Sequence, residues 1–266
     1  MNHAAKLGTA LITGASSGIG AVYADRLARR GYDLVLVARN QARLDQLAKR
    51  LADDTGRAVR TVAADLLDAA DLRRVEALLR SEPDISLLVN NAGVGSAAPL
   101  LQADVDAMEA MIDLNVTALT RLTYAAAPAF AARGAGTIIN ISSGVAVAPE
   151  FLNGVYGATK AFVLALSQSL KHELADKGVR IQAVLPGVTR TEFWDVAGTP
   201  VDSLPAEMVM SVDDLVDAAL AGLDQGEFAT VPSLPTLDGW NAFEAARAAL
   251  VSQLSLSQPG TRYALR

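Results

Sequence analysis

Short apolar runs alternate with longer amphipathic stretches along most of this 266-residue chain. The apolar runs are rich in Val, Leu, Ile and Ala, which is typical of strands that are covered on both faces of a sheet. They predict strands at residues 9–13, 33–38, 58–64, 85–89, 137–141, 179–184 and 227–231. The amphipathic stretches predict helices at residues 20–30, 41–54, 68–80, 104–133, 155–177, 212–223 and 237–254.

Glycine and proline refine the helix boundaries. Gly31 and Gly178 follow predicted helices, and each can take the left-handed conformation that often ends a helix. Proline lacks the amide hydrogen that a helix interior uses, so we expect the helix at 104–133 to be disturbed at Pro128. Residues 186–210 show no firm periodicity.

The order of the elements predicts the fold class. Apolar strands that alternate with helices favour an α/β fold with a mostly parallel sheet and helices on both faces. We find no linker and no short repeat, so we expect one doubly wound domain over residues 1–266. Such sheets bind ligands at the carboxyl ends of their strands.

Composition limits the function. Hydrophobic residues make up 51% and charged residues 20%, which suits a globular protein with a sizeable core. The net charge is −6 with acids and bases interspersed, so we expect no nucleic-acid partner, although a basic pocket for one small anionic cofactor remains open. The chain has no cysteine, and His3 and His172 are far apart, so we expect no disulfide, thiolate chemistry or metal site.

The start of the chain bears on localisation. Residues 1–8 carry no long apolar segment before a glycine-rich motif, so we expect no signal peptide. No apolar stretch reaches the roughly 18 residues of a membrane span. We therefore expect a cytoplasmic protein without a membrane partner.

A glycine-rich turn follows the first predicted strand. Gly14, Gly18 and Gly20 would let the backbone turn tightly and approach a pyrophosphate at a helix N-terminus. Their spacing is G-x-x-x-G-x-G, which differs from the standard dinucleotide fingerprint. An ordinary glycine-rich turn is the alternative.

The end of the second strand bears on cofactor choice. An acidic residue there would bind the ribose hydroxyls of NAD, but this chain has Arg39. A guanidinium at this point can bind the 2′-phosphate of NADP, with Arg43 as a possible second contact. The alternative is a solvated loop arginine.

Tyr156 and Lys160 form a candidate proton-transfer pair. They are four residues apart in a predicted helix and therefore share one face. A nearby ammonium favours the phenolate, so we expect Lys160 to lower the Tyr156 pKa below its usual value of about 10. The same spacing also occurs by chance on ordinary helices.

Two more polar residues accompany this pair. Ser143 follows a strand end, where its hydroxyl could stabilise a developing alkoxide. Asn115 lies between apolar residues of a long helix, where an amide needs partners. A polar turn and a satisfied core amide are the structural alternatives.

Taken in order, these motifs resemble the short-chain dehydrogenase/reductase family in its shorter, single-domain form. The resemblance covers residues 9–191. Beyond the glycines and the tetrad of Asn115, Ser143, Tyr156 and Lys160, the matching segments are Asp65, Asn90-Asn91-Ala92-Gly93, Pro186-Gly187 and Thr191.

This resemblance implies a Rossmann-type fold and reversible reduction of a ketone or aldehyde by hydride from NADP(H), preferred over NAD(H). It implies that Tyr156 transfers the proton, Lys160 tunes Tyr156 and binds the nicotinamide ribose, Ser143 orients the carbonyl and Asn115 supports a water relay. The cofactor contacts that it implies are Gly14, Ser16, Ser17, Gly18, Ile19, Gly20, Arg39, Asp65, Leu66, Asn91, Ala92, Gly93, Tyr156, Lys160, Pro186, Gly187, Val188, Thr189 and Thr191.

The resemblance also implies a substrate lid at about residues 188–210. Phe193 and Trp194 in it, together with Val145, Ser143 and Tyr156, are expected to contact an apolar or aromatic carbonyl substrate. The alternative is that the two lid aromatics only pack the lid onto the core. The helices that begin near residues 104 and 155 resemble those that form family interfaces, so we expect a homodimer or homotetramer.

Three other classes remain open. A related isomerase or dehydratase would typically have a longer chain and a different glycine spacing. A non-catalytic NADP(H) sensor would share the fold but typically lacks part of the tetrad, and a structural protein needs none of it. NADPH oxidation with a panel of carbonyl compounds separates the enzyme from the last two.

Overall fold

The computed structural model describes residues 7–263, except for the side chains of residues 195 and 196. The chain divides into two compact units, Met1–Pro232 and Ser233–Arg266, which we describe separately. The single-domain organisation expected from the sequence stays a prediction. None of the helices within the described residues combines the length and hydropathy of a membrane span.

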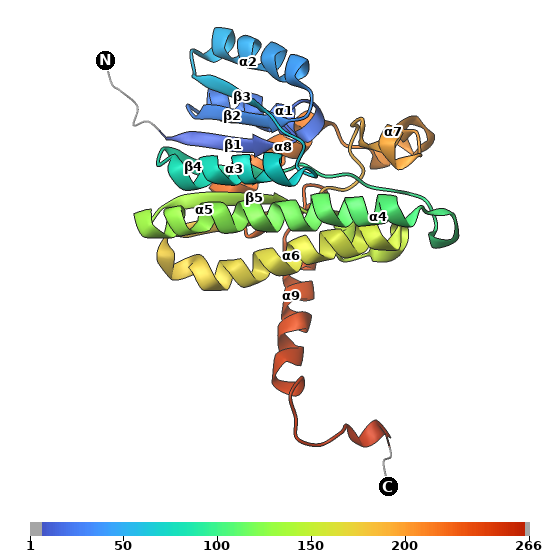
Figure 1. Cartoon of the computed structure of the whole chain (residues 1–266). Coiled ribbons are helices and arrows are strands. Elements are labelled where there is room, and N and C mark those ends of the chain that lie inside the picture. The colour runs from blue at the N-terminus through green and yellow to red at the C-terminus, as the bar shows by residue number, and fades with distance from the viewer. Residues whose placement is uncertain (1–6, 264–266) are drawn as a thin grey trace. The chain divides into compact units, whose positions relative to one another are not determined.

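The first unit is built on a seven-stranded sheet in the order β3-β2-β1-β4-β5-β6-β7 (Figure 1). Every neighbouring pair is parallel, as the continuous apolar runs predicted. The chain winds outward from β1 to β3 and then returns to the other side of β1, which creates a ligand-binding switch point there. The strands are β1 Thr9–Thr13, β2 Asp33–Ala38, β3 Val59–Ala63, β4 Ile85–Asn90, β5 Gly136–Ile141, β6 Val179–Val184 and β7 Ala229–Thr230.

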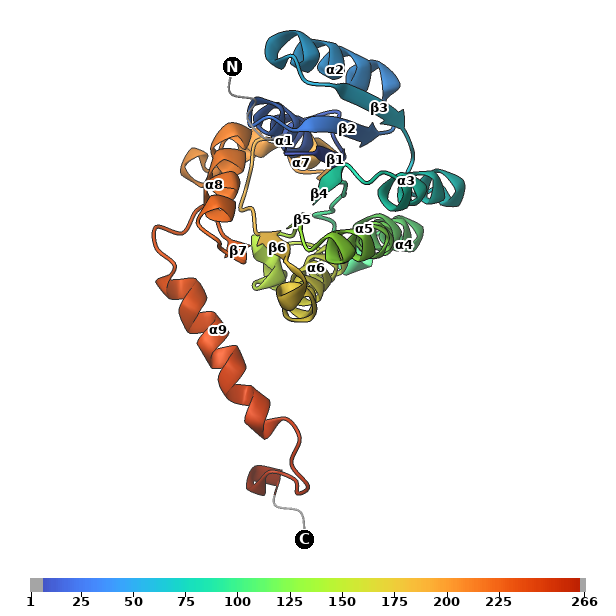
Figure 2. The same cartoon turned by 90° about the vertical axis from the view of Figure 1, so that its left-hand side faces the viewer.

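Helices cover both faces of the sheet, which confirms the doubly wound α/β class. Figure 2 shows α1 and α8 on one side and α3, α5 and α6 on the other. Two apolar cores correspond to these sides, one with side chains from α1, α2 and α8 and one with side chains from α3, α5 and α6. The helices are α1 Gly18–Arg29, α2 Gln41–Thr55, α3 Ala69–Ser81, α4 Val105–Ile112, α5 Leu119–Arg133, α6 Gly154–Leu174, α7 Phe193–Ala197 and α8 Val212–Asp224.

The long helix expected at 104–133 is interrupted, but not at Pro128. A π-helical segment, Asp113–Ala118, separates α4 from α5, and α5 continues through Pro128 to Arg133. The prediction of a disturbance at Pro128 is therefore wrong. The irregular turn occurs where Asn115 uses its side chain to bind another segment of the backbone.

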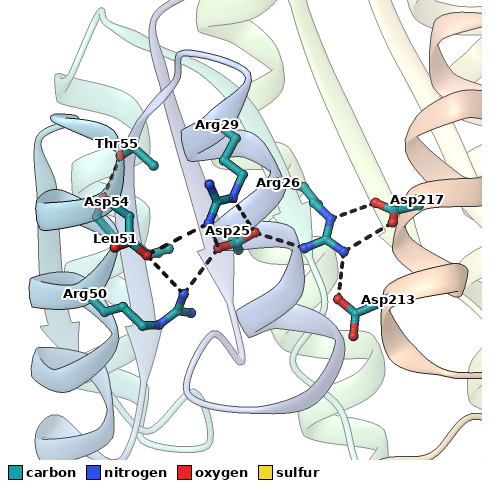
Figure 3. Close-up of polar contacts among 9 residues, drawn as sticks. All are labelled: Asp25, Arg26, Arg29, Arg50, Leu51, Asp54, Thr55, Asp213 and Asp217. Atoms are coloured by element: carbon teal, nitrogen blue, oxygen red, sulfur yellow. Dashed lines mark hydrogen bonds and ion pairs between the residues drawn. The ribbon is translucent and has the colours of Figure 1, made fainter.

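An ion-pair network joins helices α1, α2 and α8 (Figure 3). Asp25 in α1 accepts hydrogen bonds from Arg26, Arg29 and Arg50, and Arg50 belongs to α2. Arg26 also donates to Asp217 of α8 at 2.7 Å. Burial favours a raised pKa for Asp25, but its arginine hydrogen bonds outweigh that effect and lower the pKa. The network thus fixes α1 against α2 and α8.

The second unit contains helix α9, Asp238–Leu250, and a short 3-10 turn, Val251–Gln253. The α9 helix has no buried residue. The rings of Trp240 and Phe243 lie 5.4 Å apart within it.

Candidate active site

The glycine-rich turn joins the carboxyl end of β1 to α1. Gly14 and Gly18 have φ values of +64° and +53°, where other residues would be strained. A Cβ atom on Gly20 would lie 2.3 Å from the carbonyl oxygen of Gly14. Only glycine therefore permits this close turn, which leaves backbone amides accessible to a phosphate.

Asn91 braces this turn from the end of β4. Its Nδ2 donates to the carbonyl oxygens of Thr13 at 2.9 Å and Gly14 at 3.2 Å. The Thr13 hydroxyl oxygen in turn accepts from the backbone amides of Asn91 and Ala92. The segment expected to contact a cofactor thus also holds the phosphate turn in shape.

The first residues of α1 are in contact with a segment that is distant in the sequence. Ser17 is the N-cap of α1 but makes no side-chain capping bond, and its side chain is near enough to the Glu192 carboxylate to help lower the pKa of that group. A Cβ atom on Gly18 would lie 3.4 Å from Cγ2 of Thr191. Ser16 and Ile19 are half-buried beside them. Residues 191 and 192 therefore lie directly against the glycine-rich turn.

The two arginines near the end of β2 differ in their environments. Arg39 is exposed, and it has no ion-pair or hydrogen-bond partner among residues 7–263. Arg43 is held by Glu192, whose two carboxylate oxygens lie 2.9 and 3.1 Å from one guanidinium nitrogen. That contact is the main cause of the lowered Glu192 pKa. Arg39 is thus the arginine whose guanidinium is available.

The predicted adenine contact lies after β3. The Asp65 carboxylate accepts from the Leu67 amide at 3.0 Å, while the Asp65 amide donates to Asp71 at 2.8 Å. Leu66 is 7% exposed. Asp65 is therefore fixed in a turn at the carboxyl edge of the sheet.

Tyr156 and Lys160 occupy the first turns of α6. Asn153 caps this helix by accepting from the amides of Val155 and Tyr156. The Lys160 Nζ donates to the carbonyl oxygen of Ile141 at 3.0 Å and lies 5.8 Å from the centre of the Tyr156 ring. The helical spacing read from the sequence thus places the two side chains together.

The protonation of this pair is set mainly by burial. Burial raises the pKa of Tyr156 to about 12, and a hydrogen bond with Ser143 opposes this rise. Burial lowers the pKa of Lys160 to about 8. The expectation that the Tyr156 pKa falls below 10 is therefore wrong for this structure, because burial removes water from the phenol and this effect outweighs the contribution of Ser143.

The two adjacent serines have different partners. Ser142 donates to the carbonyl oxygen of Lys160 at 2.7 Å and is 2% exposed, so its hydroxyl supports the backbone of α6. The Ser143 hydroxyl donates to the carbonyl oxygen of Pro186 at 3.4 Å and is near enough to Tyr156 to lower the pKa of the phenol. Ser143, not Ser142, is therefore placed with the phenol.

Asn115 holds the backbone after β4. Its Nδ2 donates to the Val94 carbonyl at 2.8 Å and to Thr159 at 3.1 Å, and its Oδ1 accepts from the Val94 amide. A Cβ atom on Gly93 would lie 3.0 Å from Asn115 Oδ1 and 3.5 Å from Lys160 Nζ. The structure brings Asn115 beside Lys160, while its side-chain amide is engaged with protein groups.

An apolar cluster surrounds Tyr156. Val145, Met111 and Tyr156 form its buried centre, and Phe193 packs against it. The Phe193 ring lies 5.5 Å from the Tyr156 ring. Trp194 is 8% exposed and donates its indole N–H to Thr189 at 2.9 Å, so it anchors the lid segment. Its predicted contact with substrate stays a prediction.

The segment after β6 closes on itself. The Pro186 carbonyl accepts from Gly144, which fixes Pro186 beside the serine loop. The Met210 amide donates to Val188 at 2.9 Å, and the Arg190 amide donates to Met210 at 3.0 Å. The predicted lid is therefore a loop whose ends meet. Gly187 is exposed and Thr189 is buried at its base.

Comparison with known proteins identifies the family. The sequence model of the short chain dehydrogenase family matches residues 8–200. The chain belongs to this family. This short-chain dehydrogenase is therefore an oxidoreductase with a Rossmann-type fold and a cofactor of the NAD(P) type.

Solved structures of relatives agree over nearly the whole chain. A short-chain dehydrogenase from Sphingobium yanoikuyae in complex with NADPH is 52% identical, with a TM-score of 0.92 over 95% of this chain and 98% of that one. A bulky-bulky ketone specific alcohol dehydrogenase from Comamonas testosteroni is 46% identical, with a TM-score of 0.89 over 97% of this chain and 99% of that one.

A curated relative is more distant. Very-long-chain 3-oxoacyl-CoA reductase-A of Danio rerio is 34% identical over 213 residues, which are 78% of this short-chain dehydrogenase. The chain spans 66% of that relative's length.

Two residues of the site were missed by the sequence reasoning. Gly95 lies against Phe193 and Tyr156, and Glu192 pairs with Arg43. Gly95 lies two residues after Gly93, and a second glycine so close is a weak signal that another group packs directly against the backbone there. No signal in the sequence pairs residues 43 and 192.

Proposed function

We propose that this short-chain dehydrogenase reduces ketones to alcohols with NADPH. The observation that carries the proposal is the grouping of three buried side chains: Ser143 lies near enough to Tyr156 to lower its pKa, and the Lys160 Nζ lies 5.8 Å from the centre of the Tyr156 ring. Two neighbouring hydroxyls can both donate to a carbonyl oxygen that binds between them. The apolar cluster around them excludes water, which strengthens both interactions.

The turn at Gly14–Gly20 fits the pyrophosphate of a dinucleotide, because it bends tightly at the N-terminus of α1. A Cβ on Gly20 would collide with the Gly14 carbonyl oxygen and prevent this bend. Arg39 favours NADP over NAD, because its free guanidinium can bind a 2′-phosphate. An acidic residue at this position after β2 would repel that phosphate. The similarity to a relative in complex with NADPH supports the same preference. In the bound state, the reduced nicotinamide would supply the hydride to the carbonyl carbon.

The protein side chains handle the proton. Tyr156 is neutral at physiological pH, because burial raises its pKa to about 12, and it can donate its proton to the carbonyl oxygen. Ser143 donates a second hydrogen bond and orients that oxygen. The protonated Lys160 stabilises the phenolate that remains after donation. Alcohol oxidation would use the same groups in reverse.

Similarity to a ketone-specific relative favours ketones as substrates. The alcohol dehydrogenase from Comamonas testosteroni is described as specific for bulky-bulky ketones. The apolar side chains around Tyr156 are compatible with such a substrate, since Met111, Val145 and Phe193 offer no charge. We therefore propose ketones with two bulky apolar substituents as the substrate class.

The test is NADPH oxidation with a ketone panel. Wild-type protein should oxidise NADPH with bulky aryl ketones, and Tyr156→Phe should lower the rate by at least about 100-fold. Tyr124→Phe is the matched control, because Tyr124 is 63% exposed and should retain wild-type rates. Wild-type single-turnover rates in Tyr156→Phe would overturn the assignment of the proton donor.

A further inference from the structure

Gly95 leaves space that one aromatic ring fills. A Cβ atom at residue 95 would lie 2.2 Å from Cζ and 2.5 Å from Cε2 of Phe193. Such an atom would also lie 3.2 Å from Cε2 of Tyr156. Gly95 is not among the glycines with positive φ, so its backbone does not require glycine. The requirement at this position is therefore space rather than conformation.

Phe193 begins the five-residue helix α7 in the loop closed by Thr189 and Met210, and it is only half-buried. The Tyr156 ring beside it belongs to the 21-residue helix α6 and is buried. When a substrate competes for the same space, Phe193 is therefore the side chain that can yield.

The catalytic hydroxyl groups are too enclosed to receive a large ketone as they stand. Tyr156 is 6% exposed and Ser143 is 9% exposed. A carbonyl oxygen that contacts both must bring its two substituents into the apolar cluster that surrounds them. The space above Gly95 lies next to the Tyr156 ring, so one substituent would enter where the Phe193 ring now lies.

We propose that Gly95 and Phe193 together set the upper size limit for one substituent of the ketone. The Phe193 ring fills the space above Gly95 and swings away when a bulky group enters it. This inference rests on the proposed ketone reduction. Any side chain at residue 95 would remove the space for both the ring and the substituent.

The first test needs no activity. Gly95→Ala in the wild-type background should lower the melting temperature, because the new methyl group collides with the Phe193 ring. The same change in a Phe193→Ala background should cost much less, because the ring is gone. Gly154→Ala is the control, since a Cβ there meets no atom within 4 Å. Additive effects of the two changes would contradict the packing relationship.

The second test measures kcat/KM for ketones of increasing size in the wild type, in Gly95→Ala, in Phe193→Ala and in the double variant. Gly95→Ala should lower kcat/KM for ketones with two bulky groups by about 10- to 200-fold, with a smaller effect on methyl ketones. Phe193→Ala should raise the preference for the bulky ketones. Equal size preferences in active variants would overturn the size limit alone. Absence of ketone reduction in the wild type would instead overturn the proposed function.

Discussion

Lys160 is expected to make the stability of this protein depend on pH in an unusual range. Burial lowers its pKa from 10.5 to about 8 in the folded protein. Between these two values the unfolded chain binds more protons at this residue than the folded protein does. The free energy of unfolding should therefore rise with pH across this range and be lowest below pH 8.

Lys160→Met removes this dependence. One pKa unit corresponds to about 1.4 kcal/mol, so the full effect is about 3 kcal/mol, of which about 2 kcal/mol falls between pH 7 and 9.5. Methionine also leaves the Ile141 carbonyl without its lysine donor, but that cost does not change with pH. Tyr156 does not interfere, because its pKa of about 12 keeps it neutral in this range.

The measurement is urea unfolding of both proteins at pH 7 and pH 9.5. The stability of wild type relative to Lys160→Met should increase by about 2 kcal/mol between the two conditions. Lys171→Met is the matched control, because it makes the same change at an exposed lysine of the same helix. A constant difference between wild type and Lys160→Met would show that Lys160 is not a buried lysine with a lowered pKa.

The remaining predictions concern the serines, the cofactor and the fold. Ser143→Ala should lower turnover by about 100-fold, whereas Ser142→Ala should mainly cost about 1 kcal/mol of stability; steady-state kinetics with urea unfolding compares them, and the reverse order would contradict the site. Arg39→Asp should weaken NADPH binding by about 10- to 150-fold and favour NADH, by fluorescence titration; a wild type that prefers NADH would refute this. Asp25→Asn should destabilise the fold by about 3 kcal/mol in thermal or urea unfolding. Asp217→Asn, at the exposed end of the same network, should cost less than about 1 kcal/mol because Asp217 is 56% exposed; equal costs for the two changes would show that the burial of Asp25 gives it no special role.

Most of the fold could be predicted because its signals are local. The strands β2 and β6 begin and end at the residues expected from their apolar runs. The strand β7 is shorter than predicted and contains only Ala229–Thr230. Its short pairing with β6 depends on the sheet edge, which the sequence pattern does not encode.

The parts that escaped prediction depend on contacts between distant residues. The π-helical segment at Asp113–Ala118 occurs where Asn115 bonds to Val94. The interruption of the helix therefore depends on this long-range contact and not on Pro128. The pKa of Tyr156 depends on how much water its neighbours exclude, which residue spacing cannot report. The pair of Arg43 and Glu192 joins residues 149 positions apart.

The hydrogen bonds that join Val188 and Arg190 to Met210 have a consequence for insertions. The intervening chain leaves and re-enters the fold at a single point, so an insertion inside it need not move β6 or α8. Closing a flexible loop costs only about 0.6 kcal/mol more for each doubling of its length. Insertions between Ala197 and Met210 should therefore lengthen this loop at little cost in stability, while β6, α8 and the pair of Tyr156 and Lys160 keep their places.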